Sequence, residues 1–285
     1  MTTASETTQE LPRPGEERAA LEKQATPSAR KGVEHAGEMV RFSGQVLGGI
    51  PEAVRLYPSE VFRHAGLLIR QNSVVILFMT FMLGALLGIT AHFIFEAIGI
   101  GSYIGAAHTI GGMRGITEIV FGWIIAAKMG CGIVAEVGAM RISEEIDAME
   151  VMGIRSVVYL ASTRVAAAIV VIPAMWIMSL AVEFIGGFLF NVDLLSTVSQ
   201  GGFTTYLFLF QNTRDFLFAL VWGSLLGFIV VMVACFYGYK AKGGPVGVGR
   251  STAQSMLVNL VLISLVAMSL VQLFYGNSPN APIGN

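Results

Sequence analysis

Charged residues crowd into one stretch of the chain, positions 141 to 155, although the sequence on either side is apolar and rich in small residues. The charged residues in this stretch are Arg141, Glu144, Glu145, Asp147, Glu150 and Arg155. So much charge needs water, so the stretch must lie outside the hydrocarbon of a membrane. Ser143 is a favourable N-cap, acidic residues follow in the first turn, and Gly153 is placed to end a helix. The pattern predicts a short helix over residues 143–152.

The chemistry of this predicted helix is that of a docking element. Its carboxylates would face basic groups, and its apolar residues, Ile146 and Met149 above all, would enter a groove on a partner. The residues expected to make the contact are Ser143, Glu144, Glu145, Ile146, Asp147, Met149, Met152 and Gly153. A solvated loop, whose charges only keep it out of lipid, is the alternative, but it leaves the capping residues and the methionines unexplained.

Lys128 and Glu136 are predicted to be the only ionisable residues well inside a membrane span. Such residues are costly in hydrocarbon and usually face protein, water or one another. Their separation of eight residues corresponds to about 12 Å along a helix, so a direct bond between them is not expected. Each side chain either pairs with a neighbouring helix and holds the fold, or faces a functional cavity.

The segment GPVGVGRS, residues 244–251, resembles a phosphate-binding loop, except that Arg250 stands where the lysine belongs. A phosphate-binding loop needs a buried strand before it, whereas apolar helical sequence flanks this segment, so we expect no nucleotide site here. Cys131 and Cys235 lie in apolar segments, and no histidine has a partner at metal-ligand spacing. The sequence therefore predicts that the chain binds no cofactor or metal and is not an enzyme. Any ATP hydrolysis that drives it must occur on another polypeptide.

Composition indicates an integral membrane protein. Among the 285 residues, 54% are hydrophobic and 13% charged, and mean hydropathy is +0.68, which is too apolar for an ordinary soluble domain. The net charge of −1 gives no sign of nucleic acid. We expect an all-α fold with five membrane-spanning helices. The expected spans cover about 71–98, 116–140, 157–190, 214–239 and 252–275.

The segments around the spans are also distinguishable. Residues 1–39 are polar and contain three prolines, which predicts a disordered tail. Residues 40–70 mix apolar residues with arginines, which predicts amphipathic helices at the membrane surface, interrupted at Pro51 and Pro58. Polar outer loops are expected around 99–115 and 191–214. A last tail, 278–285, follows the spans of the main domain, 71–277.

Orientation follows from the lysines and arginines of the short loops. They gather before the first span, between spans two and three, and between spans four and five, whereas the opposite side has only Arg114 and Arg214. The N-terminus and the acidic helix are therefore expected in the cytoplasm, and the C-terminus outside. The predicted location is the inner (plasma) membrane.

The sequence AEVGAMRISEEIDAMEVMG, followed by YLASTR, resembles the signature of the MlaE/YrbE family, the permease subunits of MCE-type ABC lipid transporters. Further matches lie before the first span, in the second span and in the last loop, and the long polar N-terminal segment resembles the actinobacterial branch. The matching positions are Arg70, Gln71, Arg114, Gly130, Gly138, Arg164, Gly247, Gly249 and Arg250. Departures from the family pattern include Gly115 and Glu118.

The resemblance implies a set of partners. The acidic helix would be the coupling helix that fits a groove on a separate ATPase subunit. The permease would form a dimer with itself or with a paralogue, beneath extracytoplasmic MCE proteins, and would pass a lipid of the fatty acid, sterol or phospholipid class. Two alternatives remain open: a secondary transporter that uses Lys128 and Glu136 as an ion or proton relay, and a membrane scaffold without transport.

Overall fold

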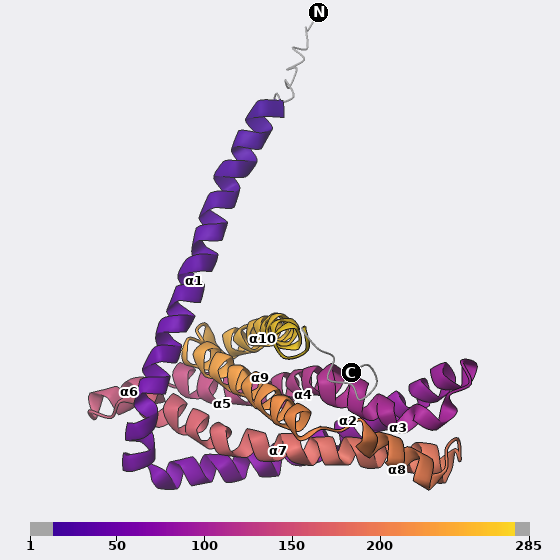
Figure 1. Ribbon diagram of the computed structural model, residues 1–285. Coiled ribbons are helices and arrows are strands. Elements are labelled where there is room, and N and C mark those ends of the chain that lie inside the picture. The colour runs from indigo at the N-terminus through magenta and orange to yellow at the C-terminus, as the bar shows by residue number, and fades with distance from the viewer. Residues whose placement is uncertain (1–13, 277–285) are drawn as a thin grey trace, which may run out of the picture. The chain divides into compact units, whose positions relative to one another are not determined.

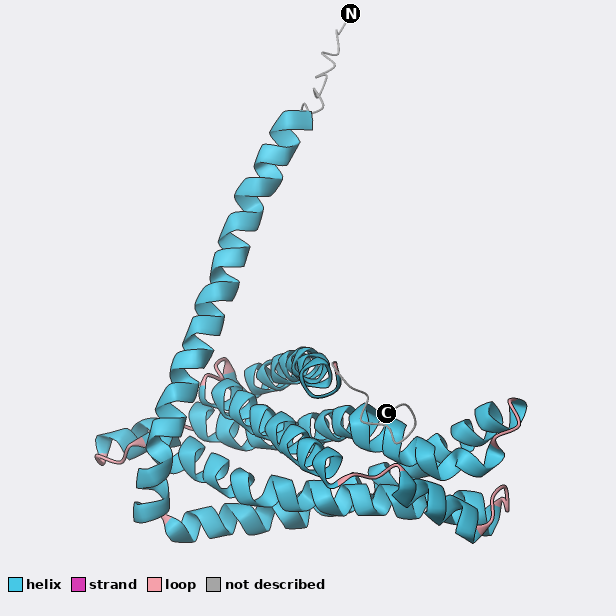
Figure 2. Ribbon diagram, in the orientation of Figure 1, coloured by secondary structure: helices cyan, strands magenta, loops and turns pink. Residues whose placement is uncertain are grey.

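The computed structural model describes residues 14–276, so the expected C-terminal tail and the first part of the expected N-terminal tail lie outside the described residues. The chain divides into two units, Met1–Gly44 and Gln45–Asn285, which are described separately. Every regular element of the described residues is a helix (Figure 2). The predicted all-α class is therefore confirmed.

The first unit contains the beginning of helix α1 (Pro14–Leu56). Residues 14–39 are helical, in contrast to the predicted disordered tail. Two properties of the sequence explain the difference. Pro14 suits the first position of a helix, and the glutamates, alanines, lysines and glutamine after it are good helix formers. Low hydrophobicity opposes burial in a core, but it does not oppose a helix.

Helix α1 continues into the second unit, and α2 (Pro58–Ala97) begins directly after Tyr57. A break at Pro58 was predicted and is found, because proline favours the first turn of a helix. No break occurs at Pro51, which lies inside α1. The segment predicted as surface helices after Pro58 is instead the first part of the same long helix that forms the first span.

Five helical segments are long and apolar enough to cross a membrane, as predicted. They are Pro58–Ala97, Gly101–Ile142, Val158–Leu194, Thr213–Tyr239 and Gly244–Tyr275. The first, fourth and fifth are α2, α9 (Thr213–Tyr239) and α10 (Gly244–Tyr275). Between spans two and three lies α6 (Glu145–Val151), and between spans three and four lies α8 (Gln200–Leu209).

The second and third spans are composite. The second comprises η1 (Gly101–Tyr103), α3 (Ile104–Ala107), η2 (His108–Ile116), α4 (Thr117–Ile125), η3 (Ala126–Gly130) and α5 (Cys131–Ile142). The third comprises η4 (Val158–Ser162), α7 (Thr163–Phe188) and η5 (Leu189–Leu194). Apart from the short 3-10 turn η1, the η segments are π-helical. The predicted outer loop around 99–115 is thus largely helical, with non-helical backbone at Arg114 and Gly115.

The spans pack through close contacts between small residues. Helix α2 lies along α7, and α9 packs against α5, α7 and α10 (Figure 1). A β-carbon at Gly84 would strike the backbone of Glu183, and one at Gly186 would strike the backbone of Phe81. The backbones of α2 and α7 therefore touch, which larger residues would prevent.

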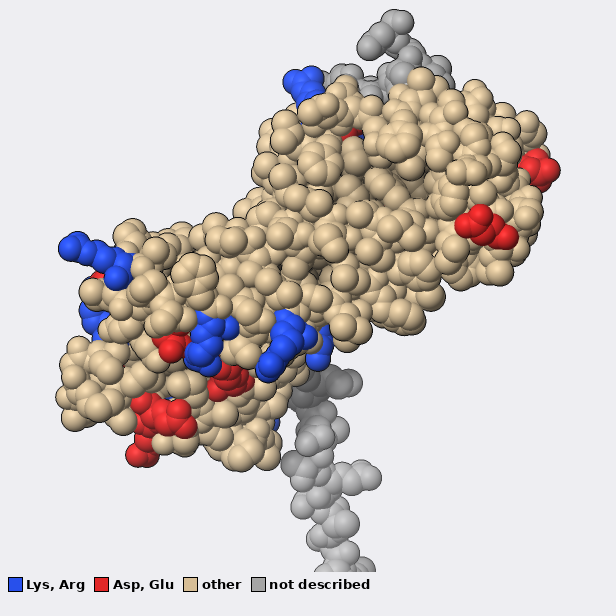
Figure 3. Space-filling view, turned by 90° about the horizontal axis from the view of Figure 1, so that it is seen from below, with Lys and Arg blue, Asp and Glu red and all other residues tan. Residues whose placement is uncertain are grey.

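Charged side chains are unevenly distributed over this unit. On the face shown in Figure 3 they gather at the end that carries α6, while the surface of this face between the two ends is almost free of charge. This is the distribution expected for a body whose middle lies in hydrocarbon. The end that carries α6 is called the α6 end below, and the other is called the α8 end.

Candidate functional site

Helix α6 occupies most of the predicted docking element, but its start differs from the prediction. Ser143 ends α5 instead of capping α6, and its hydroxyl donates to the Ala139 carbonyl at 3.0 Å and to Glu145 at 2.9 Å. Glu144 precedes α6 with a left-handed backbone, φ 62°. The tight connection between α5 and α6 takes up the residue that the capping pattern assigned to the helix. Gly153 follows α6 with φ 78°, and the prediction that it ends the helix is confirmed.

The apolar residues of α6 face two ways. Ile146 and Met149 are buried within this chain, so the prediction that they enter a groove on a partner is wrong. They hold α6 against the rest of the protein. Val151 and Met152, by contrast, are 89% and 68% exposed. The sequence analysis favoured Ile146 and Met149 and did not single out Val151, because spacing alone does not tell which of these residues meets the protein's own spans.

Two acidic residues at the start of α6 are exposed, as Val151 and Met152 are at its end. Glu145 and Met152 are seven residues apart and lie on one side of the helix, and Glu144 directly precedes the helix. We call these four residues the α6 tip surface. It joins two exposed carboxylates to two exposed apolar side chains, a composition suited to contact with a partner.

Polar contacts tie α6 to neighbouring elements. Arg141 of α5 pairs with Asp147 at 2.5 Å. Glu150 accepts from the hydroxyl of Ser156 at 2.5 Å and from that of Tyr239, the last residue of α9, at 3.0 Å. A displacement of α6 would therefore also displace the ends of α5 and α9 to which it is bonded.

A second group of contacts reaches the end of α1. Arg155, just after α6, pairs with Glu52 of α1. Ser162 in η4 donates its hydroxyl to the Val46 carbonyl at 2.8 Å, and Gly49 leaves room for this contact, since a β-carbon there would strike Ser162. The last turns of α1 are thus joined to the start of the third span.

Lys128 and Glu136 line one cavity of about 270 Å³ between α2, η3, α5 and α7. Gln71 and Arg164, which the family signature singled out, line it too. Arg164 is 3% exposed and reaches Glu136 at 2.8 Å. Four residues chosen from the sequence on separate grounds therefore meet at one place. Arg70 points elsewhere and is exposed.

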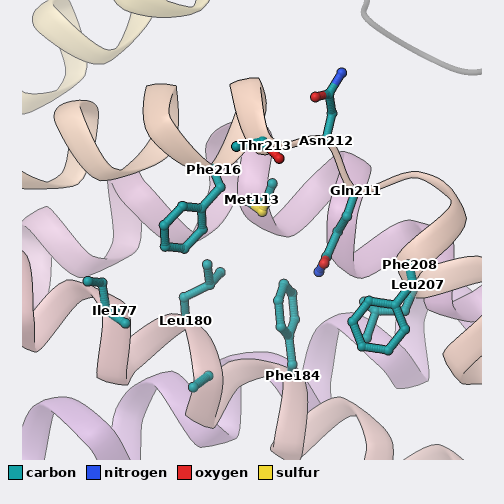
Figure 4. Close-up of a pocket in the computed structure, with 11 residues that line it drawn as sticks. Met113, Ile177, Leu180, Phe184, Leu207, Phe208, Gln211, Asn212, Thr213 and Phe216 are labelled. Carbon is teal, nitrogen blue, oxygen red and sulfur yellow. The ribbon is translucent and has the colours of Figure 1, made fainter.

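A second cavity, of about 700 Å³, lies between α7, α8 and α9 toward the α8 end (Figure 4). Its wall is mainly apolar, and polar side chains lie at the α8–α9 connection, where Gln211, Asn212 and Thr213 stand. The apolar residues of the wall include Met113, Ile177, Leu180, Phe184, Leu207 and Phe216. The volume lies within the range of small-molecule pockets, and its lining would accept acyl chains. Sequence analysis did not find this cavity, because its residues are spread over η2, α7, α8 and α9 and resemble ordinary apolar sequence.

Several buried charges were missed. The statement that Lys128 and Glu136 stand alone inside the spans is wrong. Glu183 pairs with His108 at 2.7 Å, and Asp215 pairs with Arg114 at 2.7 Å. Glu118 is fully buried as well. Glu183 lies within the predicted span 157–190 and was visible in the sequence; the pairings join residues 75 and 101 positions apart, which no local pattern reveals.

The glycines of the family signature mark close packing. Gly130 faces Val230 and Asn259, and Gly138 faces Val248 and Ala241. A β-carbon at Gly247 would strike the Lys242 carbonyl, so only glycine fits there.

The segment that resembles a phosphate-binding loop forms the start of α10. Gly249 faces open space, and Arg250 is exposed. The glycines of this segment therefore serve the packing and the turn before α10, where Gly243 and Gly244 have positive φ.

Five long apolar helices, a short acidic helix fixed between two of them, and cavities within the bundle define a multi-pass membrane protein of the transporter subunit class. The family model of the permease MlaE matches residues 61–273, and the chain belongs to that family. A probable ABC transporter permease of Rickettsia bellii is 26% identical over 253 residues, covering 88% of this chain and 97% of the relative.

Two relatives from photosynthetic organisms are also similar. A probable ABC transporter permease of Synechocystis is 29% identical over 191 residues, covering 64% of this chain and 71% of the relative. The chloroplastic protein trigalactosyldiacylglycerol 1 of Arabidopsis thaliana is 25% identical over 181 residues, covering 64% of this chain and 51% of the relative. The family signature read from the sequence is thereby confirmed.

Proposed function

We propose that this chain is the permease subunit of an ATP-driven lipid transporter of the MCE type, and that α6 couples it to a separate ATPase. The observation that carries the proposal is the α6 tip surface, which is exposed and both acidic and apolar. Helix α6 is fixed to the spans by buried residues, one ion pair and the hydrogen bonds of Glu150. A loop that only keeps charge out of lipid would need no such anchoring.

The contacts of α6 suggest how motion would pass inward. An ATPase that changes shape when it binds ATP would shift α6 as a rigid body. Arg141 would carry the shift into α5, and Glu150 would carry it through Tyr239 into α9. Helix α5 lines the polar cavity and α9 lines the apolar one, so both cavities would change shape together.

A lipid cargo is supported by the apolar cavity and by the glycolipid in the name of the Arabidopsis relative. A dimer, with a second copy or with a paralogue, follows from the family resemblance. The remaining partners, MCE proteins outside the membrane, follow from the family resemblance.

In this proposal the α6 end faces the cytoplasm. A cysteine introduced at Glu145 should react with a membrane-impermeant reagent only from the cytoplasmic side, and one introduced at Gly276 only from the outside. Labelling of both from one side would contradict the arrangement.

The coupling role is tested by Val151→Asp, with Leu194→Asp as the control. Both residues are exposed, at 89% and 67%, but Leu194 lies beyond α7 at the far end of the third span. An apolar contact of this size is worth about 1.5 to 3 kcal/mol, so Val151→Asp should weaken ATPase association by more than tenfold in pull-down from membranes. Leu194→Asp should leave it unchanged.

Met149→Asp is unsuitable for this test, because Met149 is buried in the chain itself and the change would disturb folding. If Val151→Asp, at normal membrane level, retains the ATPase as wild type does, α6 is not the coupling element. Transport that also continues without ATP would favour the ion-driven alternative.

A further inference from the structure

We propose that the cavity lined by Lys128 and Arg164 binds the negatively charged head group of an acyl lipid, a carboxylate or a phosphate ester. The inference builds on the proposed lipid transport and adds the chemical class of cargo and the place where its charge is held. It depends on the charge balance, the free donors and the shape of this one cavity.

The cavity has an excess of positive charge. Lys128 and Arg164 are cations, and Glu136 is the one carboxylate among the residues that line it. Glu136 is already bound to Arg164 at 2.8 Å. Lys128 forms neither a hydrogen bond nor an ion pair with any residue whose side chain the structure describes. A bound anion would supply the missing negative charge, in a region where an unpaired cation is costly.

Hydrogen-bond donors are also left free. Arg164 is nearly fully buried, and its guanidinium is held by the Leu160 carbonyl at 2.8 Å and by Glu136, yet its Nε–H has no partner. Lys128 brings three further N–H donors. A fixed guanidinium with an unused N–H beside a free ammonium is an arrangement that suits carboxylate and phosphate oxygens.

Besides the charged residues, the cavity has the polar side chains of His64, Gln71 and Asn72 and an apolar part, and the apolar part points to an amphiphile. Leu67, Leu68, Met129 and Ile133 face the same cavity as the charged residues. Its volume of about 270 Å³ is much smaller than the 700 Å³ of the apolar cavity. It can hold a head group with the first carbons of a chain but not a whole lipid. A free inorganic anion would leave the apolar wall without a contact.

The test uses the full chain with its partner subunits in nanodiscs, and two probes with the same sixteen-carbon chain. One probe is a fatty acid and the other the corresponding fatty alcohol, each with a photoreactive diazirine close to the polar end. The wild-type cavity should be labelled by the acid at least about tenfold more efficiently than by the alcohol, because only the acid pairs with the cations. Peptide mapping should place the label on α2 and on η3 to α5.

Three variants sharpen the test. Lys128→Met should reduce acid labelling to the level of the alcohol and leave alcohol labelling unchanged. Lys128→Arg should keep the preference for the acid. Arg70→Met, which removes an exposed cation of α2 outside the cavity, should behave as wild type.

Two results would overturn the proposal. One is a preference for the acid that survives Lys128→Met. The other is loss of acid labelling when inorganic phosphate is added at equal ionic strength, which would make the cavity a site for free anions. Neither result depends on ATPase binding. Failure of the head-group proposal would therefore leave the coupling proposal untouched, because the Val151→Asp pull-down tests that proposal separately.

Discussion

The two ends of the membrane unit differ in how their charged side chains are paired. Toward the α8 end, the side chains of Arg114 and Asp215 are 7% and 0% exposed and pair with each other, and His108 and Glu183 are both fully buried and paired. In the half nearer α6, Arg164 has an unused N–H and Lys128 has no described partner. Glu118 is the exception toward the α8 end, because it is fully buried and neither of its carboxylate oxygens has a described partner. The two pairs stabilise the fold, whereas Lys128 remains available for a ligand.

The largest effect should come from breaking a pair toward the α8 end. Arg114→Ala would leave Asp215 as an uncompensated buried charge and remove the donor to the Phe210 carbonyl. Loss of one partner of a buried pair costs about 3 to 5 kcal/mol. The folded fraction on heating in detergent should fall strongly. Arg155→Ala, which breaks the more exposed pair with Glu52, should cost at most about 1 kcal/mol. An equal loss of thermal stability in Arg114→Ala and Arg155→Ala would contradict the view that the buried pair contributes more to stability than the exposed one.

A smaller effect is expected at the other buried pair toward the α8 end, that of His108 and Glu183. Glu183→Ala removes the hydrogen bond to His108 and leaves a buried imidazole without its partner, at a cost of about 1 to 3 kcal/mol. Glu183→Gln keeps the size and the ability to hydrogen-bond and should lose less. The same heating experiment compares the two, and an equal loss would mean that packing, rather than the hydrogen bond, is what matters here.

The smallest change in stability should result from Lys128→Met. The side chain is exposed and has no described partner, so the free energy of unfolding should stay within about 0.5 kcal/mol of wild type. Arg164→Met, in the same cavity, removes the donors to Leu160 and Glu136 and should cost about 1 to 3 kcal/mol. A strong destabilisation by Lys128→Met would make Lys128 a structural residue like those toward the α8 end.

Features that depend on local composition could be predicted from the sequence. Long apolar runs indicated the five spans, because burial in hydrocarbon needs about twenty apolar residues in a row. Gly153 was recognised as the end of α6 since a positive φ favours glycine. The family signature drew attention to Gln71 and Arg164, which together with Lys128 and Glu136 line one cavity.

Features that depend on tertiary contacts could not be predicted in this way. Ile146 and Val151 have similar side chains on the same short helix, yet one is buried and the other exposed, because α5 and the neighbouring spans cover only one side of α6. The pairing of Arg114 with Asp215 joins two separate spans and leaves no trace in local spacing. The apolar cavity likewise depends on how η2, α7, α8 and α9 meet.

The π-helical segments have a consequence for motion. Spans two and three, which flank α6, each contain two such segments, whereas α9 and α10 are described as continuous α-helices. In a π-helical turn the backbone hydrogen bonds join residues five positions apart instead of four, and such turns are frequent at functional sites. We expect them to be easier to deform than a regular α-helix. We expect faster amide hydrogen exchange in η3 and η4 than in α9; the reverse order would contradict this view. The two spans that α6 connects would then respond to a displacement of α6 by rearranging their π-helical segments, and the rest of each helix would stay intact.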